Sequence, residues 1–250
     1  MAHAAAADST ALQYGSRSFI LRRLHSLSGV VPVGGFLVFH LFENLAALRG
    51  PAAYDAMVQD VNSLLPRPYF FGLELFGILL PLAFHAFYGV YLAATGQPNV
   101  GRYAYGANWL YVLQRVSGFV ALVYILVHVG VLRFFVTLMG NRLAHPPAAG
   151  DGSAMDLVRY ADVAAHLGNG HYAAVDTWMT APWMFAVYVV GTLFTLFHFT
   201  NGLNGFAFTW GIAVGRRAQR NVRLVCWALF VVLGAATLNI LWAMRFTQAS

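Results

Sequence analysis

Long runs of apolar residues, separated by polar stretches, dominate the chain. An α-helix needs about 20 such residues to cross ~30 Å of hydrocarbon. Five runs reach that length, and we expect membrane spans at residues 26–48, 70–94, 112–138, 181–206 and 222–244. The pattern predicts an all-α integral membrane protein with five transmembrane helices.

The segments outside the spans are short, with one exception. Residues 1–18 are small and polar, and we expect a flexible tail there, followed by a single membrane domain over 19–250. The loop at about 140–180 is long, and residues 153–167 have the pattern of an amphipathic helix at the membrane surface. We see no repeat and no secretory signal peptide.

Composition agrees with a membrane protein. Apolar residues make up 59% of the chain and charged residues only 10%, whereas soluble domains carry roughly 25% charged residues. The single cysteine, Cys226, excludes an internal disulfide and any cysteine-ligated metal or iron–sulfur centre in this chain.

The basic residues, which are all Arg, indicate an orientation. Five spans put the two ends of the chain on opposite sides of the membrane. With the N-terminus in the cytoplasm, nine of the 15 Arg residues face the cytoplasm and six face outward. This bias predicts a cytoplasmic N-terminus and an outer C-terminus. The basic charge therefore reports orientation, and we expect no nucleic-acid partner.

Each of the first four spans carries one histidine: His40, His85, His128 and His198. A histidine inside the membrane is costly unless something binds it. A single one could simply hydrogen-bond to a neighbouring helix, but four in successive spans favour a bound group.

Depth divides these histidines into two pairs. His40 and His128 lie about four residues beyond the middle of their spans toward the outside, and His85 and His198 lie about three to five residues beyond it toward the cytoplasm. At 1.5 Å per residue, the two levels are roughly 10–15 Å apart. His40 therefore pairs with His128, and His85 with His198.

Two stacked histidine pairs suit two haem irons, each with two axial imidazoles, better than zinc, which usually takes more protein ligands. Glycines let a ring pass close to a helix, and Gly29 and Gly118 lie near the inner level, while Gly72, Gly77 and Gly191 lie toward the outer one. No CxxCH motif occurs, so both haems would be b-type. We expect the first four helices to form a bundle around two stacked haems b.

Four segments also resemble a known family: residues 22–40 (RRLHSLSGVVPVG…H), 80–91 (LPLAFHAFYGVY), 108–118 (NWLYVLQRVSG) and 197–212 (FHFTNGLNGFAFTWGI). They are similar to the cytochrome b subunit of succinate:menaquinone oxidoreductases, the single-subunit, five-helix, di-haem type of Bacillus-like complexes. The resemblance covers nearly the whole chain, and the long outer loop and the N-terminal tail depart from it.

The resemblance implies a membrane anchor in the bacterial cytoplasmic membrane, bound to a flavoprotein subunit and an iron–sulfur subunit on the cytoplasmic side. Electrons would pass from the iron–sulfur subunit through the inner haem and then the outer haem to menaquinone, which would be reduced at this subunit. This inside-to-outside order agrees with the two depths of the histidines. A quinol:fumarate reductase, which runs the reaction in reverse, has the same architecture.

The resemblance further implies polar contacts to the inner haem propionates from His25, Ser26 and Ser28. Three arginines could neutralise these carboxylates: Arg22, Arg23 and Arg115. For Arg22 and Arg23, anchoring at the cytoplasmic surface is an equally good interpretation.

Polar residues near the outer level are candidates for the quinone site, where one of them could exchange protons with the quinone. They are Glu43, Asp60, Asn62 and Glu74. Glu43, three residues after His40, could equally be an interfacial residue that reaches water.

Two further functions remain open. The chain could be the di-haem cytochrome of another respiratory enzyme, such as a hydrogenase or formate dehydrogenase, although the whole-chain resemblance argues against this. It could also be a transporter whose membrane histidines relay protons. The paired depths, and the lack of broken-helix or inverted-repeat patterns, disfavour a transporter.

Overall fold

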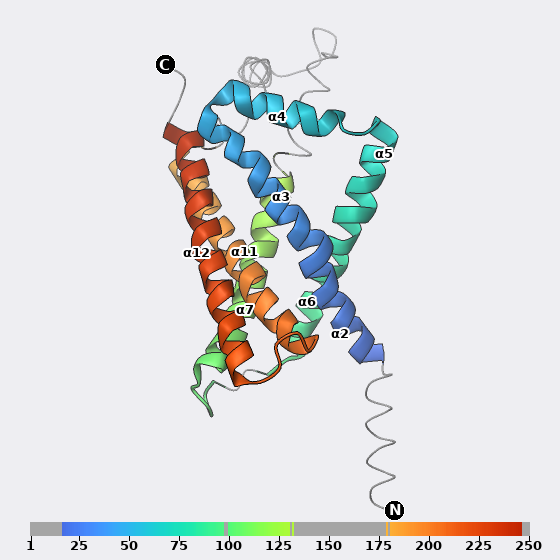
Figure 1. Ribbon diagram of the computed structural model, residues 1–250, viewed down its shortest axis with the longest axis vertical. Coiled ribbons are helices and arrows are strands. Elements are labelled where there is room, and N and C mark those ends of the chain that lie inside the picture. Colours follow the sequence, from blue (N-terminus) through green and yellow to red (C-terminus); the bar gives the residue numbers. More distant parts are fainter. Residues whose placement is uncertain (1–16, 98–99, 131, 133–178, 180, 247–250) are drawn as a thin grey trace, which may run out of the picture. The chain divides into compact units, whose positions relative to one another are not determined.

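The computed structural model describes residues 17–97, 100–130, 132, 179 and 181–246, and every element that it assigns there is a helix (Figure 1). Five helical stretches are long and apolar enough to cross a membrane. They are Arg17–Arg49, Pro68–Thr95, Gly106–Val129, Pro182–Thr209 and Arg216–Phe246. The predicted five-span, all-α membrane architecture is confirmed.

The first span is one continuous helical stretch with a wide turn in it. It consists of α2 (Arg17–Ser28), the π-helical turn η1 (Gly29–Val33), α3 (Gly34–Asn44) and a final 3₁₀ turn, η2 (Leu45–Arg49). Pro32 lies inside η1. Proline has no backbone N–H and its ring clashes with the preceding turn, so the wider π turn is where the chain accommodates it.

The second span has the same construction. It comprises α5 (Arg67–Gly72), the π-helical η3 (Leu73–Leu79) and α6 (Leu80–Thr95), and Pro81 lies in the first turn of α6. The remaining spans are regular helices: α7 (Gly106–Val129), α11 (Pro182–Thr209) and α12 (Arg216–Phe246).

Three spans begin well before the residue that hydropathy indicates. The expected starts are residues 26, 112 and 222, whereas α2 begins at Arg17, α7 at Gly106 and α12 at Arg216. The extensions of the first and last spans are rich in Arg, which suits helical turns outside the hydrocarbon.

The connection between the first two spans contains a helix. Helix α4 runs over Pro51–Ser63 and follows Gly50, whose φ of 102° favours glycine. Pro51 occupies the first turn, where its missing N–H costs nothing. Asp60 and Asn62 therefore lie on a helix.

Contacts divide the chain into two units, which are described separately. Unit 1 comprises Met1–Val38, Arg67–Arg115 and Phe199–Trp227, and unit 2 comprises Phe39–Pro66, Val116–His198 and Ala228–Ser250. In unit 1, α2 packs against α6, and η1 packs against α6 and η3. The indole of Trp210 donates to Ser26 Oγ at 3.0 Å, and the Asn201 amide donates to Gln114 at 2.7 Å.

The interior of unit 2 is a cluster of apolar and tyrosine side chains from η2, α4, α7, α11 and α12, together with Met179. Its members are Ala47, Tyr54, Tyr124, Met179, Met184, Tyr188, Ile240, Leu241 and Met244. Arg245 closes one edge by donating to the carbonyl of Met179 and lying over the Phe185 ring. The cluster ties the short helix α4 to the spans.

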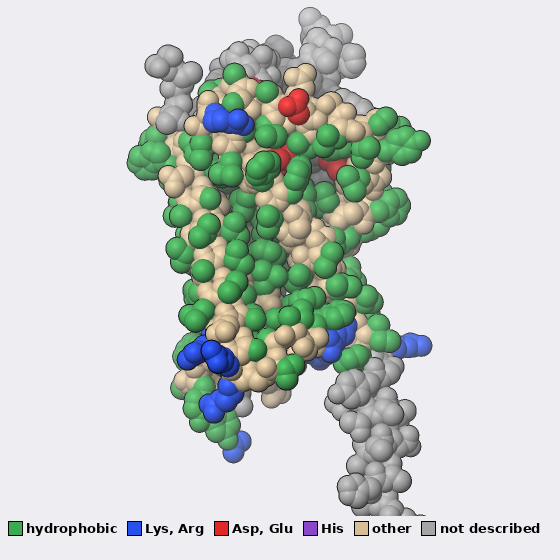
Figure 2. All heavy atoms as spheres, viewed as in Figure 1, with side chains coloured by type: hydrophobic (Ala, Val, Ile, Leu, Met, Phe, Trp, Pro, Cys, Tyr) green, Lys and Arg blue, Asp and Glu red, His purple; other side chains and the backbone are tan. Residues whose placement is uncertain are grey.

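Large apolar side chains on the spans face outward, as they do in a protein surrounded by lipid. Phe87 is 79% exposed and Leu126 is 65% exposed. Figure 2 shows hydrophobic side chains along the helices and Arg side chains at the first turns of α12. The expected tail at 1–18 and the loop at 140–180, with its surface helix at 153–167, fall largely outside the described residues.

Candidate functional site

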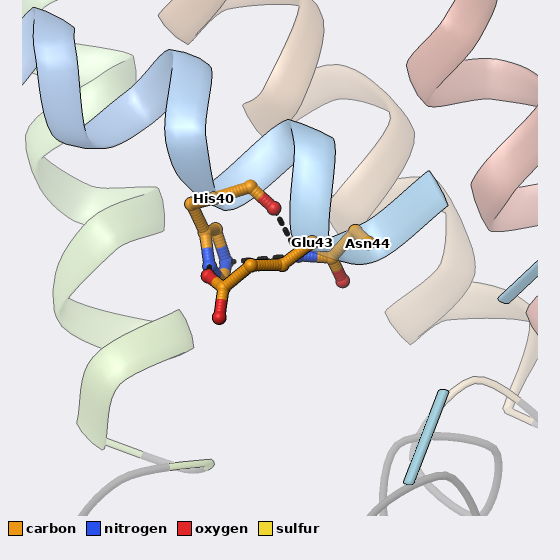
Figure 3. Close-up of polar contacts among 3 residues, drawn as sticks. All are labelled: His40, Glu43 and Asn44. Carbon is orange, nitrogen blue, oxygen red and sulfur yellow. Dashed lines mark hydrogen bonds and ion pairs between the residues drawn. The ribbon is translucent and has the colours of Figure 1, made fainter. Parts of the chain in front are cut away.

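His40 lies in the last turns of α3 and meets two polar side chains of its own helix (Figure 3). Its Nδ1 is 3.3 Å from Oε2 of Glu43. The amide nitrogen of Asn44 is 3.3 Å from its Nε2, and it donates to the His40 carbonyl at 2.7 Å. Residues three and four positions apart share a helix face, so one helical turn supplies both contacts.

His128, on α7, lies beside His40 in unit 2. The two ring centroids are 5.9 Å apart, with an angle of 70° between the planes. Nδ1 of His128 is 3.3 Å from the hydroxyl of Tyr188 on α11. Tyr124, one turn earlier on α7, packs against the rings of His128 and Tyr188. The structure thus brings together the two histidines that the sequence assigns to the outer level.

His85, on α6, is oriented by the first span. Its Nδ1 is 2.9 Å from the backbone carbonyl of His25, and its ring stacks on the His25 ring with centroids 4.1 Å apart. A carbonyl only accepts hydrogen bonds, so Nδ1 of His85 carries the proton. Its Nε2 therefore keeps a lone pair.

His198, on α11, is held from α7. Its Nδ1 is 3.4 Å from the hydroxyl of Ser117, which is completely buried. His85 belongs to unit 1 and His198 to unit 2, so their pairing stays a prediction from the sequence.

All four rings share one arrangement that fits haem ligation. Each Nδ1 lies within hydrogen-bond distance of a protein oxygen: a carbonyl, a carboxylate or one of two hydroxyls. Histidines that bind a metal through one ring nitrogen usually donate the other N–H to such a partner. In this arrangement Nε2 of each ring would be the nitrogen that meets a haem iron, and Asn44 would turn away from Nε2 of His40.

A closed metal site is a poorer fit. In the part of the chain that the structure describes, no three His, Cys, Asp or Glu side chains gather as ligands of one metal ion. Structural zinc normally takes four protein ligands, so pairs of imidazoles match a macrocycle better.

At three of the five glycines singled out in the sequence, the ring of a neighbouring side chain lies close against the helix backbone. A Cβ at Gly29 would overlap the ring of His85, and one at Gly118 would lie 2.9 Å from Cε1 of His198. A Cβ at Gly191 would overlap Tyr124. A Cβ at Gly72 would meet open space, and one at Gly77 would meet only Leu73.

The residues suggested for the haem propionates lie around the start of the first span. The hydroxyl of Ser26 donates to the Arg23 carbonyl and that of Ser28 to the His25 carbonyl, both at 3.0 Å. The guanidinium of Arg23 lies 4.9 Å from the centre of the Trp210 ring, and Arg22 is exposed.

Arg115 has a different set of contacts. Its guanidinium donates to the carbonyls of Gly96 at 3.1 Å and Leu92 at 3.3 Å. The same group lies over the Tyr111 ring and donates to the Tyr111 hydroxyl. These carbonyls end helix α6, so Arg115 caps that helix.

The four residues suggested for a quinone site are distributed over three helical elements. Glu43 contacts His40, whereas Asp60 and Asn62 are exposed on α4. Glu74 lies in η3 and belongs to unit 1, while the other three belong to unit 2.

Sequence reasoning missed Asn44, Ser117, Tyr124 and Tyr188 as neighbours of the histidines. Asn44 could have been found, because a polar residue four positions after His40 shares its helix face. Ser117 and Tyr188 are 81 and 60 residues from their histidines, and no local pattern connects them.

The chain is 40% identical over 229 residues to the succinate dehydrogenase cytochrome b558 subunit of Bacillus subtilis (strain 168). The aligned region covers 92% of this chain and 98% of that protein. No family model and no solved structure matches the chain. With this identity over almost the full length of both proteins, and with the five spans described above, the chain belongs to the family of succinate dehydrogenase cytochrome b558 subunits.

Proposed function

We propose that this protein is the membrane anchor and di-haem cytochrome b subunit of a succinate dehydrogenase. In that role it carries electrons from the iron–sulfur subunit, by way of an inner and then an outer haem b, to menaquinone. Family membership supports a subunit of such a complex. The observation that carries the haem assignment is the set of four intramembrane histidines whose Nδ1 atoms all meet protein oxygens.

His40 and His128 would hold the outer haem, and His85 and His198 the inner one. Bound haem supplies one-electron redox chemistry at potentials set by its ligands and surroundings. The chain orients the ligands: the His25 carbonyl fixes His85, Ser117 meets His198, and Tyr188 meets His128.

The start of the first span would contact the inner haem propionates. His25, Ser26 and Ser28 line this part of unit 1, and Arg22 and Arg23 supply positive charge that suits carboxylates. Arg115 is the weaker candidate, since its guanidinium already caps α6.

Menaquinone would be reduced toward the outer face, where the quinone needs protons as well as electrons. Glu43, Asp60, Asn62 and Glu74 are the proposed polar groups. Moving electrons outward couples the reaction to the membrane potential. Each elementary charge that crosses the membrane changes the free energy of the reaction by about 2.3 kcal/mol per 100 mV. A quinol:fumarate reductase would use the same residues in the opposite direction.

The complex would lie in the bacterial cytoplasmic membrane, with the N-terminus of this subunit in the cytoplasm. The flavoprotein and iron–sulfur subunits would dock on that side. Exposed arginines at the start of α2 and of α12 support this orientation, because basic residues concentrate on the cytoplasmic side.

Spectroscopy of the purified complex tests the proposal. We expect a reduced-minus-oxidised spectrum with b-type bands, two haems per subunit, and copurification with the two soluble subunits. The complex should reduce a menaquinone analogue with succinate. A purified protein without haem b would refute the proposal.

Substitution of the histidines tests the pairing. We expect His85→Ala or His198→Ala to remove the inner haem, and His40→Ala or His128→Ala to remove the outer one, because each iron loses an axial ligand. Redox titration of the remaining haem identifies which one is lost. Loss of the same haem from His40→Ala and His85→Ala would contradict the pairing.

A further inference from the structure

The partner of His40 differs in charge from the partners of the other three histidines. Nδ1 of His85 meets a backbone carbonyl, and Nδ1 of His128 and of His198 meets a hydroxyl. Nδ1 of His40 meets the carboxyl group of Glu43, 3.3 Å away. These three partners are neutral, whereas a carboxylate carries a full negative charge.

The carboxyl group of Glu43 lies in a sheltered place. Its side chain is 14% exposed, although the His40 side chain beside it is 35% exposed. Solvent weakens a charge interaction much less when the charged group is sheltered. The carboxylate also lies on the same helix turn as His40, so the contact needs no second element to form it.

Asn44 contacts His40 from the same helix turn. Its amide donates to the His40 carbonyl at 2.7 Å, and Figure 3 shows Glu43 and Asn44 reaching His40 from the same turn. The Asn44 contact with Nε2 of His40, at 3.3 Å, involves the nitrogen that would bind iron. Metal binding at Nε2 would compete with that contact alone, because the contact with Glu43 uses Nδ1 and the other Asn44 bond uses the backbone carbonyl.

We infer that Glu43 is a positioning residue for the outer haem: it accepts the Nδ1 proton of His40 and lowers the reduction potential of that haem. The inference rests on the proposed function, because it takes His40 to be an axial ligand. A carboxylate that accepts the N–H of an axial imidazole makes the ligand a stronger donor. A stronger donor, with a negative charge nearby, favours ferric over ferrous iron.

Redox titration of the whole complex, in the wild type and in Glu43→Gln, tests the inference. Gln keeps an acceptor oxygen but removes the charge. We expect the reduction equilibrium of the outer haem to shift about tenfold toward the reduced form, which is ~59 mV for one electron. The inner haem should keep its potential. The electron paramagnetic resonance signal of the oxidised outer haem should shift as well, because the donor strength of its ligand changes.

Asp55→Asn is the matched control, since it removes one negative charge from helix α4 in the same unit. An equal shift in Asp55→Asn would overturn the inference, because the effect would then be one of overall charge. An unchanged outer-haem potential in Glu43→Gln would also overturn it. If quinone reduction falls while that potential stays constant, Glu43 acts on the quinone instead.

Glu43→Asp covers the case in which Glu43→Gln fails to assemble. Asp keeps the charge but has a shorter reach, so we expect a smaller shift in the same direction, and no shift would overturn the inference. Failure of the proposed function looks different. In that case the wild-type protein lacks the outer haem, or His40→Ala retains both haems.

Discussion

His85 takes its orientation from residues about 60 positions earlier in the chain. The His25 carbonyl fixes the proton on Nδ1, the His25 ring covers one face of the imidazole, and Gly29 lets the ring lie against the helix backbone. Each of these contacts comes from the first span. A histidine held in this way has little freedom to rotate, which suits its proposed role as a haem ligand.

Gly29→Ala tests the close approach. The added Cβ would overlap the His85 ring, so the ring must leave its bond to the His25 carbonyl. We expect the affinity for the inner haem to fall at least about tenfold, which the haem-to-protein ratio and the reduced-minus-oxidised spectrum would measure.

Gly35→Ala is the control for this substitution, because a Cβ at Gly35 would have nothing within 4 Å. We expect it to retain both haems. An inner haem that is unaffected by Gly29→Ala would mean that His85 can move without losing its ligand role.

Within unit 2, helix α4 is anchored by Tyr54. This side chain is 8% exposed and packs in the cluster that contains Tyr124 and Tyr188. The helix is short and amphipathic, and isolated helices of its length are marginal in water. Tertiary contacts therefore decide whether α4 stays in place.

Tyr54→Ala should destabilise the protein by about 3 kcal/mol, because removing a buried aromatic ring leaves a cavity. In a chain of this size that corresponds to a fall in melting temperature of roughly 6–12 °C, measurable by thermal denaturation in detergent. Tyr69→Ala, at a position that is 71% exposed, should have little effect. Equal losses from both variants would argue against Tyr54 as the anchor of α4.

Arg115→Met tests the cap of α6. It removes the hydrogen bonds to Gly96 and Leu92, and bonds from a charged donor contribute about 1.5–3 kcal/mol. We expect a lower melting temperature, and only partial recovery in Arg115→Lys, because an ammonium lacks the planar fork of a guanidinium. A fall in inner-haem content at unchanged stability would indicate a propionate contact instead.

The sequence predicted the spans well and the surroundings of the histidines poorly. Hydropathy is a local property, so the five apolar runs and the histidine in each of four spans are visible without a structure. The helical turns of α4, and the π turns at Gly29–Val33 and Leu73–Leu79, leave no hydropathy pattern. Ser117 and Tyr188 reach their histidines only through folding.

The charged residues of the whole molecule are distributed unevenly along the chain. Arg216, Arg217, Arg220 and Arg223 fall in the first turns of α12, while Asp55 and Asp60 fall on α4. The positive-inside rule therefore predicts that the connection between α6 and α7 faces the cytoplasm and that α4 faces outward.

Cysteine labelling in intact cells tests this topology. Leu65 and Gly101 are exposed residues in successive connections, and Cys226 is buried. We expect a membrane-impermeant maleimide to label Leu65→Cys in intact cells and Gly101→Cys only after the membrane is opened. The unmodified chain gives the background from Cys226. The reverse pattern would place the N-terminus outside.

The sequence separation of the histidine contacts has a consequence for biosynthesis. His40 meets Glu43 within one turn, so the contact that orients this proposed ligand lies within the first span. The contact that orients His85 comes from the first span, so it can form once the second has been made. His128 and His198 take their contacts from pairs of residues on α7 and α11, which exist together only after most of the chain has been synthesised. The proposed inner haem, which would bind His85 and His198, would therefore have to wait for the fourth span.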